Sequence, residues 1–333
     1  MSTQRVTLAV LAKSLKLSTC TVSKILNKSL KGVRHAPETI RRVEEAAERM
    51  GYRANAQARA LRTRRSQLIG FLLPSAQTSV FGELTDRLEF ELRAFGLHLL
   101  IGHSRNSADE EARLLSMFLS HGVDGLLWIP SRERLHLADY QLPKGFPVVV
   151  LDRPASCAGA VHVITDNRKS SRLLAQRIYD HGHRHVAVLN SSPGDRSMKE
   201  RLAGIEDVFG ASLTVADGEN TAEAGRGAAD RWFEEPWSFT ALVALSEPLA
   251  IGALGAMRDH DIAAPHGLSF AAFDDFPLAA HWSPRITVLR QDIPSIARVA
   301  VARLSALLAD PGSPVESVRV PAILEWRDSV TPR

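Results

Sequence analysis

The sequence predicts two units of different fold class, a small all-α unit at the N-terminus and a much larger α/β region after it. Apolar residues recur at helical spacing near the N-terminus, whereas short apolar runs alternate with amphipathic stretches from Gln67 onward. The charge changes at the same place. Residues 1–65 hold fifteen Lys and Arg but four Glu, a net charge of +11, and the remainder carries −7. A basic unit on an acidic body indicates a polyanionic partner, and a merely solvated basic face is the alternative.

The bulk composition limits the class of protein. The chain has 333 residues, of which 45% are hydrophobic and 23% are charged, as in ordinary globular proteins of two or three domains. The longest apolar runs, such as Val148–Leu151, are too short to span a bilayer, and no signal-peptide core is present. The two cysteines, Cys20 and Cys157, suggest no disulfide framework. We therefore expect a cytoplasmic protein that has no membrane partner.

Three short helices are predicted in the basic unit. Thr7 suits the N-cap of the first helix, and the second spans Thr19–Leu26 behind Ser18 as its cap. Pro37 fits the first turn of the third helix, which Gly51 ends. The inward faces consist of Leu8, Leu11, Ala12, Leu15, Val22, Ile25, Leu26, Ile40, Val43, Ala47 and Met50. The first two helices form a helix-turn-helix, in which the second helix would enter the major groove of DNA.

The α/β region alternates strands and helices. The predicted strands are Leu68–Leu73, Leu97–Ile101, Gly125–Ile129, Val148–Leu151, Val161–Ile164, Val186–Leu189, Ala241–Leu245, Leu268–Phe273, Val318–Val320 and Ile323–Trp326. The predicted helices are Phe81–Phe95, Ala108–His121, Lys169–Asp180, Met198–Phe209, Ala222–Phe233, Leu249–Arg258 and Ile293–Leu308. In the first of these helices, Leu84, Leu88, Leu92 and Phe95 form the inward face. Such alternation predicts parallel sheets covered on both faces, with a ligand site beyond the carboxyl ends of the strands.

The basic unit resembles the lactose-repressor (LacI/GalR) family. The resemblance lies in Val6–Leu8 with Leu17–Asn27, and in Thr39–Val43 with Met50–Leu61. It implies that the second helix reads bases through Thr19, Cys20 and Lys24 and anchors on phosphates through Thr21, Ser23 and Asn27. The DNA-binding residues expected in this way are Thr7, Ser18, Thr19, Cys20, Thr21, Ser23, Lys24, Asn27, Asn55, Arg59, Leu61 and Arg62. For Cys20, a tolerated surface residue is the equally weighted alternative.

The resemblance also implies a hinge helix at residues 55–65 that forms on DNA. Asn55 would cap a helix of about two turns, which is marginal by itself. Leu61 would then enter the minor groove and unstack a base step, the alternative being a packing residue of a linker. Two departures from the family stand out. Lys16 occupies the turn where glycine is frequent, and the loop from Asn27 to Thr39 is about three residues longer than usual.

The resemblance continues through the α/β region. It is carried by Asp124-Gly125, Leu151–Arg153, Asp166-Asn167, Gly182–Arg184, Arg201–Gly204, Ala272–Asp275 and Arg327–Ser329. It implies two Rossmann-like lobes of the type I periplasmic-binding-protein kind, joined by three crossovers, with an effector cleft between them. The expected boundaries are 1–54 for the DNA-binding domain and 66–333 for the effector domain. The two lobes of that domain are expected at 66–164 with 292–320 and at 165–289 with 321–328.

By the same resemblance, the effector is a sugar or sugar derivative, and the family also includes members that bind purines and nucleosides. The expected effector-binding residues are Pro74, Phe81, Asp152, Arg201, Asn220, Ser246 and Asp274. Helix N-capping is the alternative for the two aspartates, and a salt bridge across the cleft is the alternative for Arg201. Ser246-Glu247 replaces a frequent Asn-Asp pair, so the ligand need not be a common hexose.

Enzyme classes lack support in the sequence. The nucleophile elbow, the phosphate-binding loop and the dinucleotide fingerprint are all absent, and we expect no catalytic residue, metal or cofactor. The alternating histidines of His181–His185 fit a helix C-terminus better than a metal site. The sequence therefore predicts a homodimeric regulator that binds operator DNA and a small-molecule effector. A sugar-binding protein without DNA function and an enzyme on the same fold are the rivals.

Overall fold

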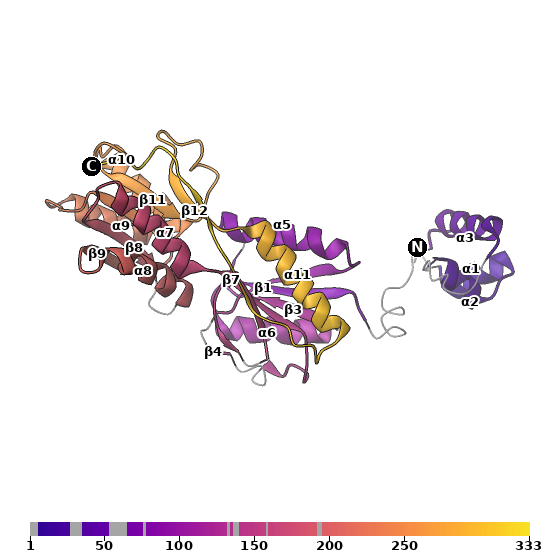
Figure 1. Ribbon diagram of the computed structural model, residues 1–333. Coiled ribbons are helices and arrows are strands. Elements are labelled where there is room, and N and C mark those ends of the chain that lie inside the picture. Colours follow the sequence, from indigo (N-terminus) through magenta and orange to yellow (C-terminus); the bar gives the residue numbers. More distant parts are fainter. Residues whose placement is uncertain are drawn as a thin grey trace. The chain divides into compact units, whose positions relative to one another are not determined.

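A computed structural model describes residues 6–26, 35–52, 65–75, 78–131, 134–135, 140–157, 159–191 and 195–333. Its contacts divide the chain into two compact units, Met1–Ser66 and Gln67–Arg333. Figure 1 labels the helices and strands of both units. None of the helices in the described part combines the length and apolar character needed to cross a membrane.

The N-terminal unit consists of the helices α1 (Leu8–Leu15), α2 (Thr19–Leu26) and α3 (Pro37–Arg49). Thr7 caps α1 by accepting the Val10 N–H at 3.4 Å, and Ser18 caps α2 by accepting the Thr21 N–H at 3.0 Å. The three helices share one core, which consists of Leu11, Ala12, Val22, Ile25, Val43, Ala46 and Ala47. These helices and their shared core confirm the predicted helix-turn-helix fold.

Lys16 adopts the left-handed conformation that the tight turn between α1 and α2 requires. Its φ and ψ angles are 56° and 37°, and its N–H donates to the Ala12 and Lys13 carbonyls. A non-glycine residue there costs on the order of 1 kcal/mol. The turn is nevertheless closed, because the Leu17 N–H also reaches the Ala12 carbonyl at 3.0 Å. Residues 27–34 of the long loop, and all of the hinge except Arg65, lie outside the described residues.

The first lobe of the larger unit is built on a parallel six-stranded sheet in the order β13-β7-β5-β3-β1-β2. Its strands are β1 (Leu68–Leu73), β2 (His98–His103), β3 (Gly125–Trp128), β5 (Val148–Leu151), β7 (Val161–Thr165) and β13 (Val318–Val320). The helices α5 (Ser79–Arg93) and α11 (Ile293–Ala309) cover one face, and α6 (Ala108–Ser120) covers the other. The short strands β4 (Arg134–Leu135) and β6 (Ser156–Cys157) pair with each other beside this sheet.

The second lobe repeats the plan in the order β14-β12-β11-β10-β8-β9, with β14 antiparallel to β12. Its strands are β8 (Val186–Ser191), β9 (Leu213–Gly218), β10 (Ala241–Ala244), β11 (Ser269–Phe273), β12 (Thr287–Arg290) and β14 (Ile323–Glu325). The helices α7 (Asn167–Asp180) and α8 (Arg196–Phe209) cover one face, and α9 (Ala222–Phe233) and α10 (Glu247–Asp259) cover the other. The two lobes confirm the predicted α/β fold class.

The chain passes between the lobes three times. The crossovers follow β7, β12 and β13, and they lead into α7, α11 and β14 respectively. The chain thus leaves the first lobe, completes most of the second, returns once to the first, and ends in the second. Because three separate segments join the lobes, a movement of one lobe against the other has to bend all three.

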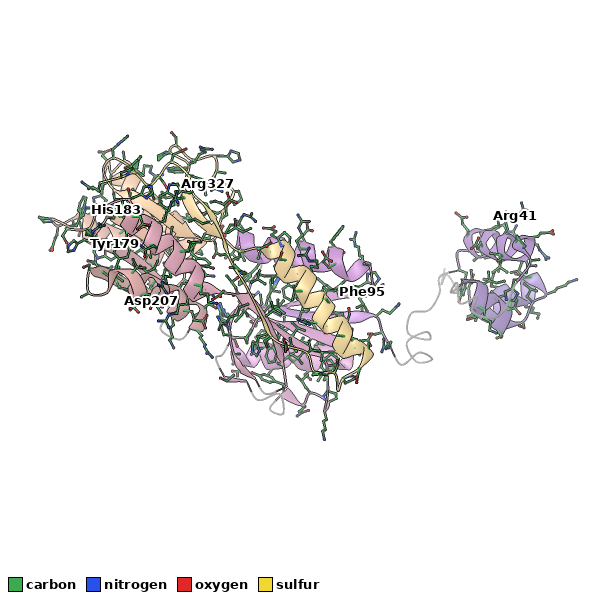
Figure 2. The ribbon with its side chains drawn as sticks, in the orientation of Figure 1. Arg41, Phe95, Tyr179, His183, Asp207 and Arg327 are labelled. Atoms are coloured by element: carbon green, nitrogen blue, oxygen red, sulfur yellow. The ribbon has the colours of Figure 1, made fainter. Side chains whose placement is uncertain are left out.

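Some sequence-based details were wrong. Phe95 does not belong to the inward face with Leu84 and Leu88, because α5 ends at Arg93 and the following turn directs Phe95 outward, where it is 55% exposed (Figure 2). The strands β9 and β12 were not predicted. The residues of β9 are exposed or half-buried, as at the edge of a sheet, so the strand lacks an apolar run. β12 has four residues, too few for periodicity to identify.

The helices α9 and α10 approach each other closely through glycine. A Cβ atom at Gly252 would lie 2.1 Å from the Ala222 carbonyl oxygen, and one at Gly225 would lie 2.7 Å from that of Leu249. Neither helix backbone can yield without separating from its partner. Gly255 lies in the same helix as Gly252, yet a Cβ atom there would meet nothing within 4 Å.

This contrast gives a matched pair of variants. We expect Gly252→Ala to lower the free energy of unfolding by about 1–3 kcal/mol, because the added methyl group forces the helices apart. Gly255→Ala should leave stability unchanged or raise it by up to about 1 kcal/mol, because alanine favours the helix. Chemical denaturation of the full chain measures both. Equal effects of the two substitutions would show that close packing does not hold this helix pair.

Candidate functional site

The N-terminal unit presents small polar side chains along one side of α2. Ser18, Thr19, Cys20 and Lys24 are exposed, as is Thr7 before α1, whereas Val22 and Ile25 fix the opposite side in the core. Thr21 and Ser23 are half-buried, and the Ser18 and Thr21 hydroxyls lie 2.8 Å apart. The other predicted DNA contacts, Asn27, Asn55, Arg59, Leu61 and Arg62, lie outside the described residues.

A cleft of about 810 Å³ lies between the two lobes of the larger unit. All seven residues predicted to bind an effector line it or the pocket at its base. Pro74 and Phe81 come from the first lobe, and Asn220 comes from the second. The deeper residues are Asp152, Arg201, Ser246 and Asp274. The folded chain therefore brings together residues that are up to 200 positions apart in the sequence.

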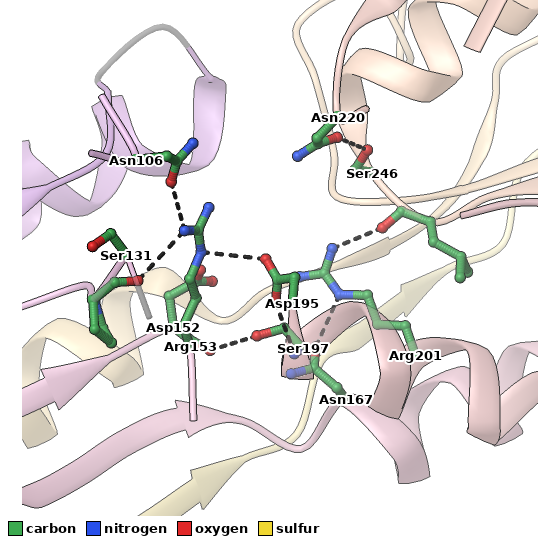
Figure 3. A network of polar contacts seen from close by, with 12 residues as sticks. Asn106, Ser131, Asp152, Arg153, Asn167, Asp195, Ser197, Arg201, Asn220 and Ser246 are labelled. Atoms are coloured by element: carbon green, nitrogen blue, oxygen red, sulfur yellow. Dashed lines mark hydrogen bonds and ion pairs between the residues drawn. The ribbon is translucent and has the colours of Figure 1, made fainter. Parts of the chain in front are cut away.

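Arg201 is the most constrained of these residues. Its side chain leaves α8 and is buried, donating from Nε to Asn167 at 3.0 Å and from Nη1 to the Leu245 carbonyl at 2.8 Å (Figure 3). Nη1 also lies 3.2 Å from the Asp274 carboxylate, and the guanidinium stacks 3.7 Å above the Phe273 ring. All these partners belong to the second lobe, so the alternative of a salt bridge across the cleft is wrong.

Asp274 is positioned by its backbone as well as by its partners. It follows β11 with a φ angle of 72°, and its carboxylate also accepts the Gln291 Nε2–H at 2.8 Å. No helix begins after it, and the same holds for Asp152, so helix N-capping is wrong for both aspartates. An effector that reaches Asp274 meets a carboxylate already bound on two sides.

Asp152 lies in a different environment. It follows β5 with a φ angle of 57°, and no described residue donates a hydrogen bond to its carboxylate. Desolvation by burial raises the pKa of Asp152 to about 6, although Arg201 and Arg153 oppose that shift. Its backbone carbonyl accepts the Ser197 hydroxyl at 3.1 Å from the other lobe. The carboxylate therefore lacks the donors that would normally satisfy a charge at this depth.

Arg153 was not among the residues expected at the site, yet it crosses the cleft. Its Nε lies 3.3 Å from the carboxylate of Asp195, which caps α8 in the second lobe. Its Nη1 donates to the Asn106 side chain at 2.7 Å (Figure 3). The sequence signals were its position beside Asp152 at a strand end and its place in the segment Leu151–Arg153, which carries part of the family resemblance.

Glu247 makes the second polar link between the lobes. It is the first residue of α10, and its carboxylate accepts the Ser79 N–H at 2.8 Å and the Ser79 hydroxyl at 2.9 Å. Ser79 begins α5 of the first lobe, where Thr78 makes no side-chain cap of its own. Burial raises the pKa of Glu247. Beside it, the Ser246 hydroxyl donates to Asn220 at 2.6 Å.

The histidine cluster has a structural explanation. His183 is buried, with Nδ1 2.7 Å from the Thr240 hydroxyl and Nε2 3.1 Å from the Thr331 carbonyl. Burial lowers its pKa. Over the described part of the chain, no group of three or more His, Cys, Asp or Glu side chains is placed to hold a metal ion.

The environment of Asp152 predicts a stability effect of definite sign. The raised pKa means that the charged form is costly in the folded state, by on the order of 3 kcal/mol above pH 6. Asp152→Asn removes that cost, so the variant should unfold a few degrees higher than the wild type at pH 7.5. The gain should shrink as the pH falls below 6 and vanish only below the ordinary aspartate pKa of 3.8, where the carboxyl group is protonated in both states. Thermal unfolding of both chains across this range is the measurement, and a gain independent of pH would contradict the assignment.

Comparisons with known proteins extend these observations to the family level. Residues 175–330 match the model of the periplasmic binding protein-like domain. The regulator GalS of Salmonella typhimurium is 27% identical over 305 residues, covering 89% of this chain and 88% of its own. The transcriptional repressor PurR of Escherichia coli is 27% identical over 96% of both chains. These relatives are transcriptional regulators and not enzymes.

Solved structures agree on the fold. The lac repressor dimer bound to operator and an anti-inducer superposes with a TM-score of 0.84 at 20% identity, covering 98% of this chain and all of that one. The regulator CelR in complex with cellobiose gives a TM-score of 0.71 at 22% identity, with the same coverage. The chain is therefore similar over nearly its full length to transcriptional regulators of the lactose-repressor (LacI/GalR) type.

Proposed function

We propose that the chain is a cytoplasmic repressor that binds a pseudo-palindromic operator as a homodimer and changes its operator affinity when a small ligand occupies the cleft. The ligand is a sugar or sugar derivative. The observation that carries this proposal is the combination of an α2 surface suited to a DNA groove with a separate polar cleft between two lobes. Neither feature by itself would distinguish a regulator from a simple DNA-binding or sugar-binding protein.

The DNA part of the proposal rests on the shape and charge of the N-terminal unit. The side chains of Thr19 and Cys20 are short and exposed at the start of α2, so the helix backbone can approach base edges closely. Lys24, one turn later, supplies a point charge that can reach a base or a phosphate. The hydroxyls of Ser18 and Thr21 suit phosphate oxygens, which fix the register of the helix.

The dimer follows from the size of this surface and from the larger unit. One helix-turn-helix covers too few base pairs for a specific site, and a two-fold pair of them reads two half-sites. The larger unit exposes large apolar side chains, among them Phe90 at 66%, Phe95 at 55% and Leu278 at 58%. Apolar surface of this kind is typical of a face that another protein covers. The lac repressor structure named above is likewise a dimer bound to operator.

The ligand part rests on the cleft being shared by both lobes. A ligand held by Phe81 of the first lobe and Asn220 of the second favours the lobe arrangement in which both contacts form. If that arrangement sets the spacing of the two N-terminal units in a dimer, ligand and operator affinities are coupled reciprocally. The structure of CelR bound to cellobiose supports a sugar as the effector.

Selection of fragmented genomic DNA by the purified full-length protein tests the central claim. We expect one enriched, roughly two-fold-symmetric sequence, with an affinity that falls steeply as salt rises because phosphate contacts release counterions. A sugar-binding protein without DNA function would enrich nothing and show no salt-dependent binding. An enzyme on this fold would instead convert its ligand, which chromatography of the ligand after incubation would detect.

The hinge makes a separate prediction. Leu61 lies outside the described residues, and we propose that it wedges into the minor groove from a hinge helix that forms on DNA. Leu61→Ala should weaken operator affinity roughly tenfold or more, because bending the duplex depends on an apolar wedge between base steps. Ligand binding should be unchanged. Gel-shift titrations of the variant measure the effect, with Leu173→Ala, at an exposed leucine of α7, as the matched control; an unaltered operator affinity would rule out intercalation.

A further inference from the structure

The cleft also constrains the charge of its ligand. On the premise that the proposed function places a ligand here, we propose that this ligand is a polyhydroxylated molecule that is uncharged or carries an amino group, and not one that carries a phosphate or a carboxylate. Three observations support this: the arginines of the cleft already lie beside carboxylates of the protein, the N-terminus of α5 already receives a carboxylate, and no described residue donates a hydrogen bond to the Asp152 carboxylate.

The arginines that could receive an anion are engaged. Arg201 makes two hydrogen bonds and an ion pair within the second lobe and lies against the Phe273 ring, with a side chain 4% exposed. Arg153 lies 3.3 Å from Asp195 and donates from Nη1 to Asn106, although its Nε makes no hydrogen bond, and the side chains of Arg153 and Asp195 are less than a fifth exposed. An anionic ligand at either guanidinium would have to compete with a carboxylate that already lies beside it. Such an exchange separates a formed charge pair without adding a new positive partner.

The N-terminus of α5, one of the helix N-termini at the cleft, is occupied as well. Free amides at such a terminus are the usual backbone site for a phosphate or a carboxylate. In this chain, the Ser79 amide at the start of α5 already donates to Glu247, and the Ser79 hydroxyl does the same. Glu247 is 8% exposed and comes from the opposite lobe, so in the observed lobe arrangement a carboxylate of the protein already occupies this anion site.

The remaining charge in the cleft repels anions. The Asp152 carboxylate accepts no hydrogen bond from any described residue and faces the pocket at the base of the cleft. At the rim, Glu219 and Glu223 add two carboxylates, whereas Arg196 is half-exposed and lies 3.8 Å from Glu200. Ligand hydroxyls can donate to Asp152, and a ligand ammonium can pair with it, whereas a second anion close to it is strongly disfavoured.

A matched panel tests the inference with the full-length chain. The same hexoses and pentoses are offered as the neutral sugar, the amino sugar, the sugar acid and the sugar phosphate. Binding is read at the backbone amides of Ser79 and Asp152 by NMR, so that anions attracted to the basic N-terminal unit are not counted. We expect a neutral or amino member to shift these amides at least about tenfold more tightly than its acidic and phosphorylated counterparts.

Variants then assign the preference to particular carboxylates. Asp152→Asn should weaken the amino sugar about tenfold and the neutral sugar less, and Asp180→Asn, an exposed aspartate at the end of α7, should change neither. Glu247→Gln should narrow the gap between neutral and anionic sugars, because the α5 N-terminus loses its competing charge. Tighter binding of an acid or a phosphate by the wild type overturns the inference, and so does the absence of binding by every member. Because operator selection is independent of this panel, an enriched operator together with either result would refute the charge assignment and leave the proposed regulator intact.

Discussion

The buried guanidinium of Arg201 is the interaction on which the geometry of the cleft depends. It joins the start of α7, the end of β10 and the end of β11 through Asn167, the Leu245 carbonyl and Asp274. From Asp274 the hydrogen bonds continue to Gln291, which in turn accepts the Thr165 hydroxyl. Thr165 and Gln291 lie on two of the three segments that cross between the lobes. The base of the ligand site is thereby connected to the segments that must bend when the lobes move.

The hydrogen bonds around Arg201 do more to position the strand ends than to stabilise the fold. A buried ion pair repays most of its desolvation cost and seldom exceeds an apolar replacement in net stability. Its directional bonds, however, allow one arrangement of strand ends, because Asp274 can reach both Arg201 and Gln291 only with its left-handed backbone. Removal of Asp274 would leave a buried, uncompensated guanidinium. Asp152, which has no such partner, is therefore the cleaner residue for probing the ligand site by substitution.

The sequence predicted features that depend on residues close together along the chain better than contacts between residues far apart along it. The caps Thr7 and Ser18 and the buried Val22 were readable because their causes lie within four residues along the chain. The cleft residues could be predicted as polar groups at strand ends, and the family resemblance indicated that they share one ligand site. The sequence could not show that Arg201 is fully engaged, because its partner Asp274 lies 73 positions away. It also could not show that Glu247 reaches Ser79, since that contact depends on how the lobes close.

The links between the lobes define what a ligand has to change. Glu247 with Ser79, Arg153 with Asp195, and Ser197 with the Asp152 carbonyl all join the lobes, and Arg319 with Glu200 adds a pair farther from the base of the cleft. These contacts favour the observed lobe arrangement by themselves, so a ligand that only bridges the lobes adds little differential free energy. A ligand shifts the equilibrium to the extent that it replaces these contacts with stronger ones, or breaks one of them. Since no described residue donates a hydrogen bond to the Asp152 carboxylate, a ligand that supplies a donor there adds a contact, and we expect this gain to couple ligand binding to the lobe arrangement.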